Sequence, residues 1–408
     1  MNASLISKLR LCDQTPVIEA RTETMNEQRL TQWEAISLMV GAGVGAGIMA
    51  VPYLAMQVGF LGLAIILPVA WAASSLVHLM LAEVLFRTGR DLQIVELMHL
   101  YVLRGRYGRW LLWTVFALLS IAFLANLAAY VSGAGEILAR LMSINRYLAE
   151  ILVYAISAGV VFFGLKAVGI AERFGTIMLV GLIAVIATGA FSVPFQLSLE
   201  LSGTSTHWLM LYAMVMYALW TFYSVPQVVK GLGADRRSAV RAILIGLAIN
   251  GVLTALVALL ALGISTQVTE VAIIGISEQL GYWAGMTGSL FILFAMMTSY
   301  WSVSLALADM LHERIGLPNK AAWLLATVPS LLMVWLGDWQ FLESLRLAAG
   351  ATAIVVALIT IPMYWQARRH GPISNPVWTL GRWGHPVMLA LALLALVLMA
   401  AGSLVSVN

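Results

Sequence analysis

At positions 41–47 the sequence reads Gly41-Ala42-Gly43-Val44-Gly45-Ala46-Gly47, and Pro52 follows in the same apolar stretch. Each glycine costs about 1 kcal/mol relative to alanine in a helix interior. Such a run either brings two helices into close contact, for which Gly43 and Gly47 have suitable spacing, or marks an unwound segment. Alternating glycines place small residues all around the helix, and Pro52 removes a further backbone hydrogen bond. We therefore predict that this helix is broken.

The composition around this stretch is that of a membrane protein. Of the 408 residues, 61% are hydrophobic and 10% are charged, whereas a soluble domain has roughly 25% charged residues. The surplus apolar surface must face lipid, where each spanning segment of about 20 residues has to be helical. The sequence predicts an all-α integral membrane protein with eleven transmembrane helices, near 34–57, 60–86, 109–139, 147–165, 174–193, 207–230, 239–262, 282–310, 321–337, 341–362 and 385–405.

The lysine and arginine residues predict the orientation of the chain, because they concentrate on cytoplasmic segments. With the N-terminus in the cytoplasm, every lysine and arginine except Arg140, Arg146 and Arg346 falls on a cytoplasmic segment. We therefore expect a cell inner (plasma) membrane protein with a cytoplasmic tail at 1–32 and its C-terminus outside. The net charge of +4 is then explained by topology, so no nucleic-acid partner is expected.

Two connections have a helical pattern of their own. From Asp91 to Arg104, apolar residues recur at helical spacing beside a basic face. This pattern predicts a short helix at the cytoplasmic interface, with a solvated loop as the alternative. On the outer side, we expect a small lid-like helix at 266–280, which contains no basic residue.

A second irregular stretch reads Leu219-Trp220-Thr221-Phe222-Tyr223-Ser224-Val225-Pro226. Alone it is equally well explained by a simple proline kink. However, it lies in the first helix of a second block of five spans, as the glycine run does in the first block. Since five is odd, the second block enters the membrane from the opposite side. Paired interrupted helices in inverted repeats indicate a midplane binding site in secondary transporters. The predicted blocks are 33–193 and 207–362, followed by an eleventh helix at 385–405.

The two breaks suit a zwitterionic substrate. The outer half of the first helix begins near Gly45, where free N–H groups can accept a carboxylate. The outer half of the sixth helix ends near Trp220, where free carbonyls can receive an ammonium group. Neither break contains a charged residue, which favours a neutral L-amino acid imported by alternating access. The candidate substrate-binding residues are Gly45, Ala46, Gly47, Trp220, Phe222, Ser224 and Phe123.

Three segments resemble a known family. Val44–Pro52 is similar to the first-helix signature of the amino acid/auxin permeases and of the bacterial hydroxy and aromatic amino acid permeases. Thr298–Leu305 resembles the eighth helix of the bacterial group, and Leu219–Phe222 resembles the sixth-helix break of the wider amino acid–polyamine–organocation permeases. The resemblance implies a leucine-transporter-type fold with a 5+5 inverted repeat plus one helix. This sequence differs from the family at position 46, which is alanine where many relatives have serine.

A site for a coupling cation is also indicated. Ala295, Thr298 and Ser299 share a helix face, and their oxygens suit a small hard cation. The resemblance implies that the carbonyls of Gly41 and Val44 complete this site. Span 5 at 174–193 contains no ionisable side chain, so the lysine that replaces the cation in some proton-coupled relatives has no counterpart there. We therefore favour sodium, with proton symport as the alternative because the closest bacterial look-alikes are regarded as proton symporters.

Other classes of function lack their motifs. The sequence has no metalloprotease spacing after His312-Glu313 and no phosphate-binding loop of the GxxxxGK[ST] type. A channel needs a continuous polar face, which most of the spans lack. A channel or a non-transporting membrane sensor is the alternative of another class. Apart from the coupling cation, no cofactor is expected, and the expected partners are an amino acid and the lipid bilayer. The sequence leaves open the amino acid, the stoichiometry and the oligomeric state.

Overall fold

A computed structural model describes residues 29–264, 276, 279–336 and 341–405. The lid-like helix predicted at 266–280 therefore lies largely outside the described residues. Every element within them is helical. In chain order they are α3 (Gln32–Gly43), α4 (Ala46–Val58), α5 (Phe60–Thr88), α6 (Ile94–Tyr101), α7 (Gly105–Met142), α8 (Arg146–Phe162), α9 (Leu165–Gly189), η1 (Ala190–Ser192), α10 (Ser205–Ala218), η2 (Phe222–Ser224), α11 (Val225–Leu232), α12 (Arg236–Ile264), α14 (Tyr282–Ile315), α15 (Asn319–Leu336), α16 (Phe341–His370), η3 (Gly381–Gly384) and α17 (Pro386–Leu404).

Many of these helices have the length of a membrane span. Within the described residues, eight are long and apolar enough to cross a bilayer, or nine when the bent pair α3–α4 is counted as one span. One of the eight combines α10, η2 and α11 as Ser205–Leu232. The predicted spans 4 and 10 correspond to α8, which has 17 residues, and α16, and neither is in this group. The count of eleven thus stays a prediction.

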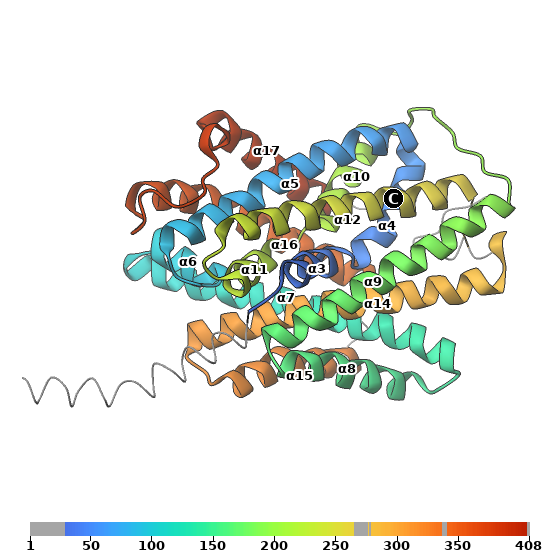
Figure 1. Cartoon of the computed structure of the whole chain (residues 1–408), viewed down its shortest axis with the longest axis horizontal. Coiled ribbons are helices and arrows are strands. Elements are labelled where there is room, and N and C mark those ends of the chain that lie inside the picture. The colour runs from blue at the N-terminus through green and yellow to red at the C-terminus, as the bar shows by residue number, and fades with distance from the viewer. Residues whose placement is uncertain (1–28, 265–275, 277–278, 337–340, 406–408) are drawn as a thin grey trace, which may run out of the picture.

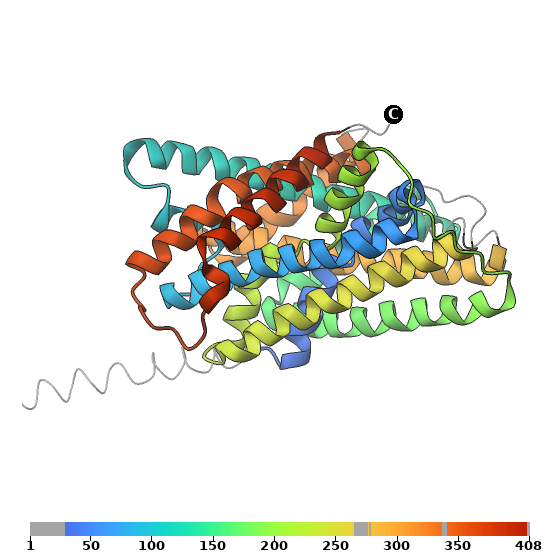
Figure 2. The same cartoon turned by 90° about the horizontal axis from the view of Figure 1, so that it is seen from above.

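The helices form two packed groups with further helices between and around them (Figures 1 and 2). In one group, α7, α8, α14 and α15 pack on one another. In the other, α3–α4, α5, α10 and α12 do so. Helix α9 packs between α3 and α14, while α16 packs on α5 and α7. Helix α17 lies against α10 and α16.

The packed pairs match when the predicted five-span blocks are placed in register. The contact of α3 with α12 corresponds to that of α10 with α5. Likewise, α7 with α15 corresponds to α14 with α8, and α9 with α14 corresponds to α16 with α7. The block limits of 33–193 and 207–362 themselves stay a prediction.

The first span breaks at its glycine run. Thr31 and Glu34 form a capping box at the start of α3. Helix α3 ends at Gly43, and α4 begins after Gly45, with a bend of 53° between them. Gly45 is the N-cap residue of α4 and provides no side chain to accept its first N–H groups. The first N–H groups of α4 therefore have no side-chain cap.

The sixth span breaks between Ala218 and Phe222, and α5 supplies partners for the released backbone groups. The Ser74 hydroxyl donates to the Leu219 carbonyl at 3.0 Å. The His78 ring bonds the Ser74 carbonyl through Nδ1 at 2.6 Å, so Nε2 is free to accept the Thr221 N–H at 3.2 Å. In a medium without water this pairing is what permits an unwound segment.

The fifth span differs from its predicted bounds. Helix α9 begins at Leu165 rather than at 174. The predicted start of the fifth span was wrong because the charged residues Lys166 and Arg173 are typical of a cytoplasmic loop. In the structure Lys166 instead reaches Glu34 of α3 at 2.7 Å, and Glu172 is fully buried inside the helix. The statement that span 5 has no ionisable residue therefore fails.

The short helix predicted between Asp91 and Arg104 is confirmed as α6 (Ile94–Tyr101). Its apolar residues Val95 and Met98 are each 1% exposed. They belong to a face that packs on α7, α14 and α16. Neighbouring helices of the protein therefore cover the apolar face of α6, which is not exposed to lipid alone.

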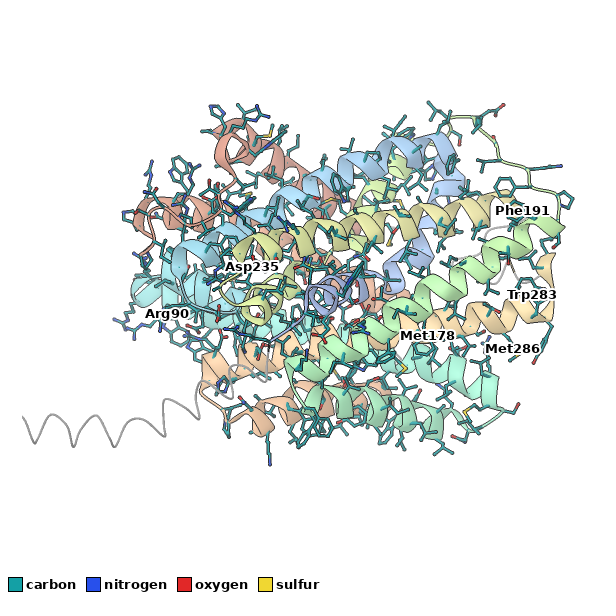
Figure 3. The ribbon with its side chains drawn as sticks, viewed as in Figure 1. Arg90, Met178, Phe191, Asp235, Trp283 and Met286 are labelled. Carbon is teal, nitrogen blue, oxygen red and sulfur yellow. The ribbon has the colours of Figure 1, made fainter. Side chains whose placement is uncertain are left out.

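Topology can be tested at two exposed connections. Arg90 and Phe191 lie at opposite ends of the molecule (Figure 3). In a Cys12→Ser background, the Asp91→Cys variant is expected to react with a membrane-impermeant maleimide only from the cytoplasmic side. The Ser198→Cys variant is expected to react only from the outside. Both positions are exposed. Labelling of both variants from one side would contradict the orientation.

The role of His78 predicts a loss of stability on its removal. His78→Ala leaves the buried Thr221 N–H without its acceptor, and an unsatisfied buried group costs about 1–3 kcal/mol. We expect the free energy of unfolding in detergent micelles to fall by that amount. His370→Ala, at an exposed position, is the control. Equal denaturation curves for the two variants would show that His78 does not support the break.

Candidate substrate site

The two breaks meet at the centre of the protein. A side-chain carbon added at Gly47 would lie 3.0 Å from the Ala218 Cα and 3.1 Å from its backbone nitrogen. The N-terminal end of α4 therefore touches the C-terminal end of α10. The positive end of the α4 dipole, which has no side-chain cap, and the negative end of the α10 dipole are brought together in this way.

A small cavity lies beside this contact. Its volume is about 20 Å³, which is room for about one water molecule. No charged side chain lines it in the described part of the chain. The lining residues are Ala42, Gly43, Gly45, Gly47, Phe123, Asn126, Tyr130, Tyr217, Trp220, Tyr223 and Thr352.

Helix α7 contributes one face to the cavity. Phe123, Asn126 and Tyr130 are spaced by three and four residues, so they share a helical stripe. The Tyr217 hydroxyl of α10 donates to the Asn126 side-chain oxygen at 3.3 Å. Sequence analysis identified Phe123 but missed Asn126 and Tyr130. Their spacing from Phe123 was the signal that could have found them.

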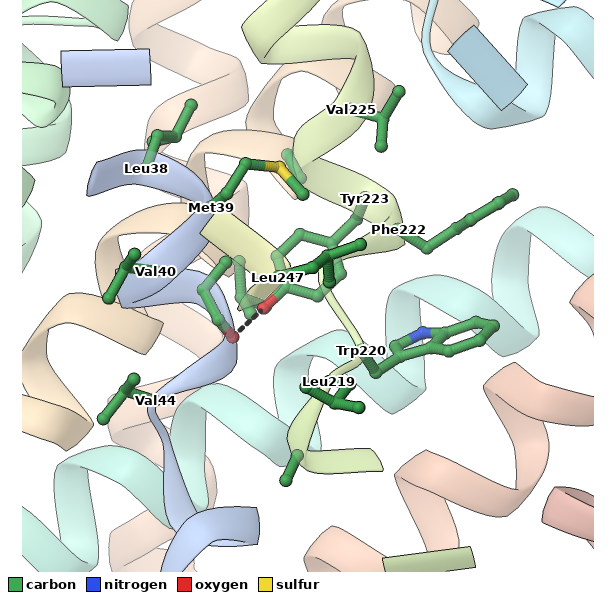
Figure 4. Close-up of a cluster of buried hydrophobic side chains, with 14 of the residues drawn as sticks. Leu38, Met39, Val40, Val44, Leu219, Trp220, Phe222, Tyr223, Val225 and Leu247 are labelled. Carbon is green, nitrogen blue, oxygen red and sulfur yellow. Dashed lines mark hydrogen bonds between the residues drawn. The ribbon is translucent and has the colours of Figure 1, made fainter. Parts of the chain in front are cut away.

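The aromatic residues after the second break point in two directions (Figure 4). Tyr223 points toward α3, and its hydroxyl donates to the Ala42 carbonyl at 3.1 Å. Phe222 stacks on Trp220 with ring centroids 5.5 Å apart and meets His78 edge-on at 5.8 Å. Because of the η2 turn, Tyr223 lines the cavity and Phe222 contacts His78 of α5.

The predicted substrate residues are thus partly brought together. Gly45, Gly47, Trp220 and Phe123 line the cavity. Ala46 is the first residue of α4. Phe222 and Ser224 are buried next to the break but are not lining residues.

The predicted cation-binding residues lie where α14 packs on α3. The Ser299 hydroxyl donates to the Gly41 carbonyl at 3.0 Å. The Thr298 hydroxyl donates to the Ala295 carbonyl of its own helix at 3.0 Å. Val44 is fully buried at the end of α3. These hydroxyl and carbonyl oxygens fit a hard cation chemically, and the hydroxyls bond to carbonyls of the same set.

Sequence analysis missed one ionisable group in this region. Glu172 of α9 is fully buried. Its carboxyl occupies the space that a side chain at Gly41 would fill. The Ser302 hydroxyl of α14 donates to Glu172 Oε1 at 2.6 Å. Glu172 therefore lies at the junction of α3, α9 and α14.

Comparisons with known proteins agree with this architecture. Residues 29–403 match the tryptophan/tyrosine permease family. A protein from Haemophilus influenzae described as "Tyrosine-specific transport system 1" is 24% identical over 372 residues, covering 84% of this chain and 90% of the relative.

A solved structure shares the fold. It is Mhp1, described as a nucleobase-cation-symport-1 family transporter in a closed conformation with bromovinylhydantoin bound. The TM-score is 0.63 at 14% sequence identity, and the match covers 92% of each chain. With the family match spanning most of the sequence, this chain belongs to the tryptophan/tyrosine permease family and is a multi-pass membrane transporter, not an enzyme.

Proposed function

We propose that this protein is a secondary active transporter that imports a neutral aromatic L-amino acid by alternating access, driven by an ion gradient. The contact between the N-terminal end of α4 and the C-terminal end of α10, beside a cavity walled by aromatic rings, is the observation that supports it most. The family match adds support.

Recognition of the amino-acid backbone follows from the two helix ends. A carboxylate is stabilised by the open N–H groups after Gly45, and an ammonium group by the open carbonyls near Ala218. The absence of a side chain at Gly47 lets the two ends approach each other closely. No charged side chain is needed for either group.

Recognition of the side chain follows from the cavity wall. Phe123 of α7 and Trp220 and Tyr223 of the sixth-span break surround the same space. Aromatic pairs prefer stacked or edge-to-face contact, so this wall favours an aromatic substrate. The Trp220 Nε1 has no hydrogen-bond partner among the described residues and is available to a polar substrate atom. The Haemophilus influenzae relative is described as tyrosine-specific.

Alternating access requires the site to expand. Ligand pockets typically enclose roughly 300–1,000 Å³, against about 20 Å³ for this cavity. The structure therefore corresponds to a closed conformation in which the aromatic side chains fill the site. Binding moves these side chains and the helices behind them outward, toward one side of the membrane at a time.

We propose that sodium is the driving ion and that it binds to Gly41, Val44, Ala295, Thr298 and Ser299. The alternative driving ion is the proton. We place the protein in the cell inner membrane with its N-terminus in the cytoplasm.

Counterflow in proteoliposomes tests the substrate. Vesicles loaded with unlabelled tyrosine are expected to take up labelled tyrosine, and external tryptophan or phenylalanine to compete with it. Lysine and glutamate, which need a charged partner in the site, are expected not to compete at the same concentration. Competition by lysine or glutamate equal to that by tyrosine would overturn the neutral aromatic assignment.

Gly47→Val tests the position of the site. The new side chain would press on the backbone of α10 at Ala218. Overpacking of this kind costs about 1–3 kcal/mol, so tyrosine affinity should fall roughly tenfold or more. Gly181→Val on α9 is the matched control, because a side chain there meets nothing within 4 Å. Scintillation proximity binding to both purified variants measures the difference. Equal affinities would contradict the proposed site.

A further inference from the structure

Buried acidic residues in this protein fall into two kinds. Glu34, Glu83, Glu150 and Glu172 are each at most 3% exposed. The first three each have a cationic partner at 2.7–2.8 Å: Lys166, Arg87 and Arg146, respectively. Glu172 has no such partner among the described residues.

The surroundings of Glu172 leave one oxygen free. Oε1 accepts the Ser302 hydroxyl at 2.6 Å. Oε2 has no hydrogen-bond partner in the described part of the chain, although it is buried. Oε2 is also the atom closest to the space beside Gly41, whose carbonyl accepts Ser299. An unpaired acceptor oxygen thus lies next to the predicted cation-binding set.

Ionisable groups on the neighbouring helices do not compensate the charge. On α3, Glu34 is bonded to Lys166 of α9. On α14, Asp309 lies 3.7 Å from Lys230 of α11. Each cation is therefore paired with another acid.

Two further residues near Glu172 do not add a compensating charge. The Tyr223 hydroxyl of η2 donates to the Ala42 carbonyl. Arg173 follows Glu172 directly, but its side chain is exposed. An ionised carboxylate buried without a counter-charge is strongly disfavoured.

We propose that Glu172 provides the negative charge that binds the coupling cation, with Oε2 as the binding atom. This inference rests on the proposed transport function and replaces an all-neutral cation site by a charged one. The ligand is a small monovalent cation, either Na⁺ or a proton. Sodium would be shared with nearby oxygens such as the Gly41 carbonyl. A proton would form an O–H bond on Oε2, and that bond would break on release to cytoplasmic water.

Coupling follows from the position of Glu172 between helices. When the carboxylate is neutralised, α3 can pack against α9 at Gly41 as in the closed structure. Without a cation, burial of the charge disfavours that packing. Because α3 also carries Gly43 and its end is next to Gly45, cation and substrate bias the same helix. If both favour the closed packing of α3, each raises the affinity for the other by the same factor.

Glu172→Gln separates coupling from transport, because glutamine keeps the size of the side chain and removes its charge. In proteoliposomes the variant is expected to retain tyrosine counterflow. It should lose the accumulation that an inward pH or sodium gradient drives in the wild type, so that inner and outer concentrations become equal. Glu136→Gln is the control, because Glu136 is exposed and paired with Arg140. It should accumulate tyrosine as the wild type does.

A second pair of variants keeps Glu172 in place. Ser302→Ala removes the donor to Oε1, and hydrogen bonds to charged groups are strong enough to shift the apparent cation affinity about tenfold. Ser304→Ala is the control, since its hydroxyl donates to the Tyr300 carbonyl of its own helix at 2.6 Å. The half-saturating cation concentration for tyrosine uptake is the measurement. We expect the half-saturating cation concentration to shift for Ser302→Ala and not for Ser304→Ala. This comparison tests the inference even if Glu172→Gln fails to fold.

Two gradients identify the ion. Wild-type accumulation that is abolished by a protonophore in sodium-free vesicles identifies a proton, and accumulation that requires sodium identifies Na⁺. In either case, accumulation by Glu172→Gln under the same gradient would overturn the inference. Absence of tyrosine counterflow in the wild type would instead refute the proposed function on which the inference rests.

Discussion

A helix that breaks inside a membrane must find partners for the backbone groups it releases, because lipid supplies none. Much of this structure depends on that constraint. Helix α5 meets it at the sixth span through Ser74 and His78, which bond to Leu219 and Thr221. At the first span, the Ser299 hydroxyl of α14 donates to the Gly41 carbonyl at 3.0 Å, and the Tyr223 hydroxyl of η2 donates to the Ala42 carbonyl at 3.1 Å. The segments that pack on the broken spans therefore also supply their hydrogen-bond partners.

The same constraint underlies the proposed substrate site at the two breaks. Where α5 satisfies a released group, that group is no longer available. At the start of α4, Gly45 offers no side chain to cap the first N–H groups, and the proposed function assigns these groups to the substrate carboxylate. The end of α10 at Ala218 lies against Gly47. In the proposed site, a substrate that carries both an acid and an amine would bond to both helix ends at once, in place of protein side chains.

The breaks and much of the cavity could be predicted because glycine and proline act locally on the backbone. Phe222 and Tyr223 could not be told apart, since a short 3₁₀ turn does not follow the α-helical spacing. Asn126 resembles an ordinary polar residue in an apolar helix until Tyr217 is brought to it by the fold. Glu172 was missed for another reason. Its neighbour Arg173 indicates a loop, and only the packing of α9 on α3 shows that the carboxyl is buried.

The acidic residues of this protein differ in how their negative charge is compensated. Ion pairs such as Glu34–Lys166 and Lys230–Asp309 involve residues at the ends of helices, where part of the lysine side chain stays exposed. At these positions the ionic partner and the nearby water both offset the free-energy cost of burying the charged groups. Glu172 has neither, so an apolar or amide side chain of the same size would give a more stable closed state. A group that lowers the stability of one conformation shifts the balance between conformations unless something neutralises it. If Glu172 binds the coupling cation as we propose, the bound cation offsets this cost and favours the closed state.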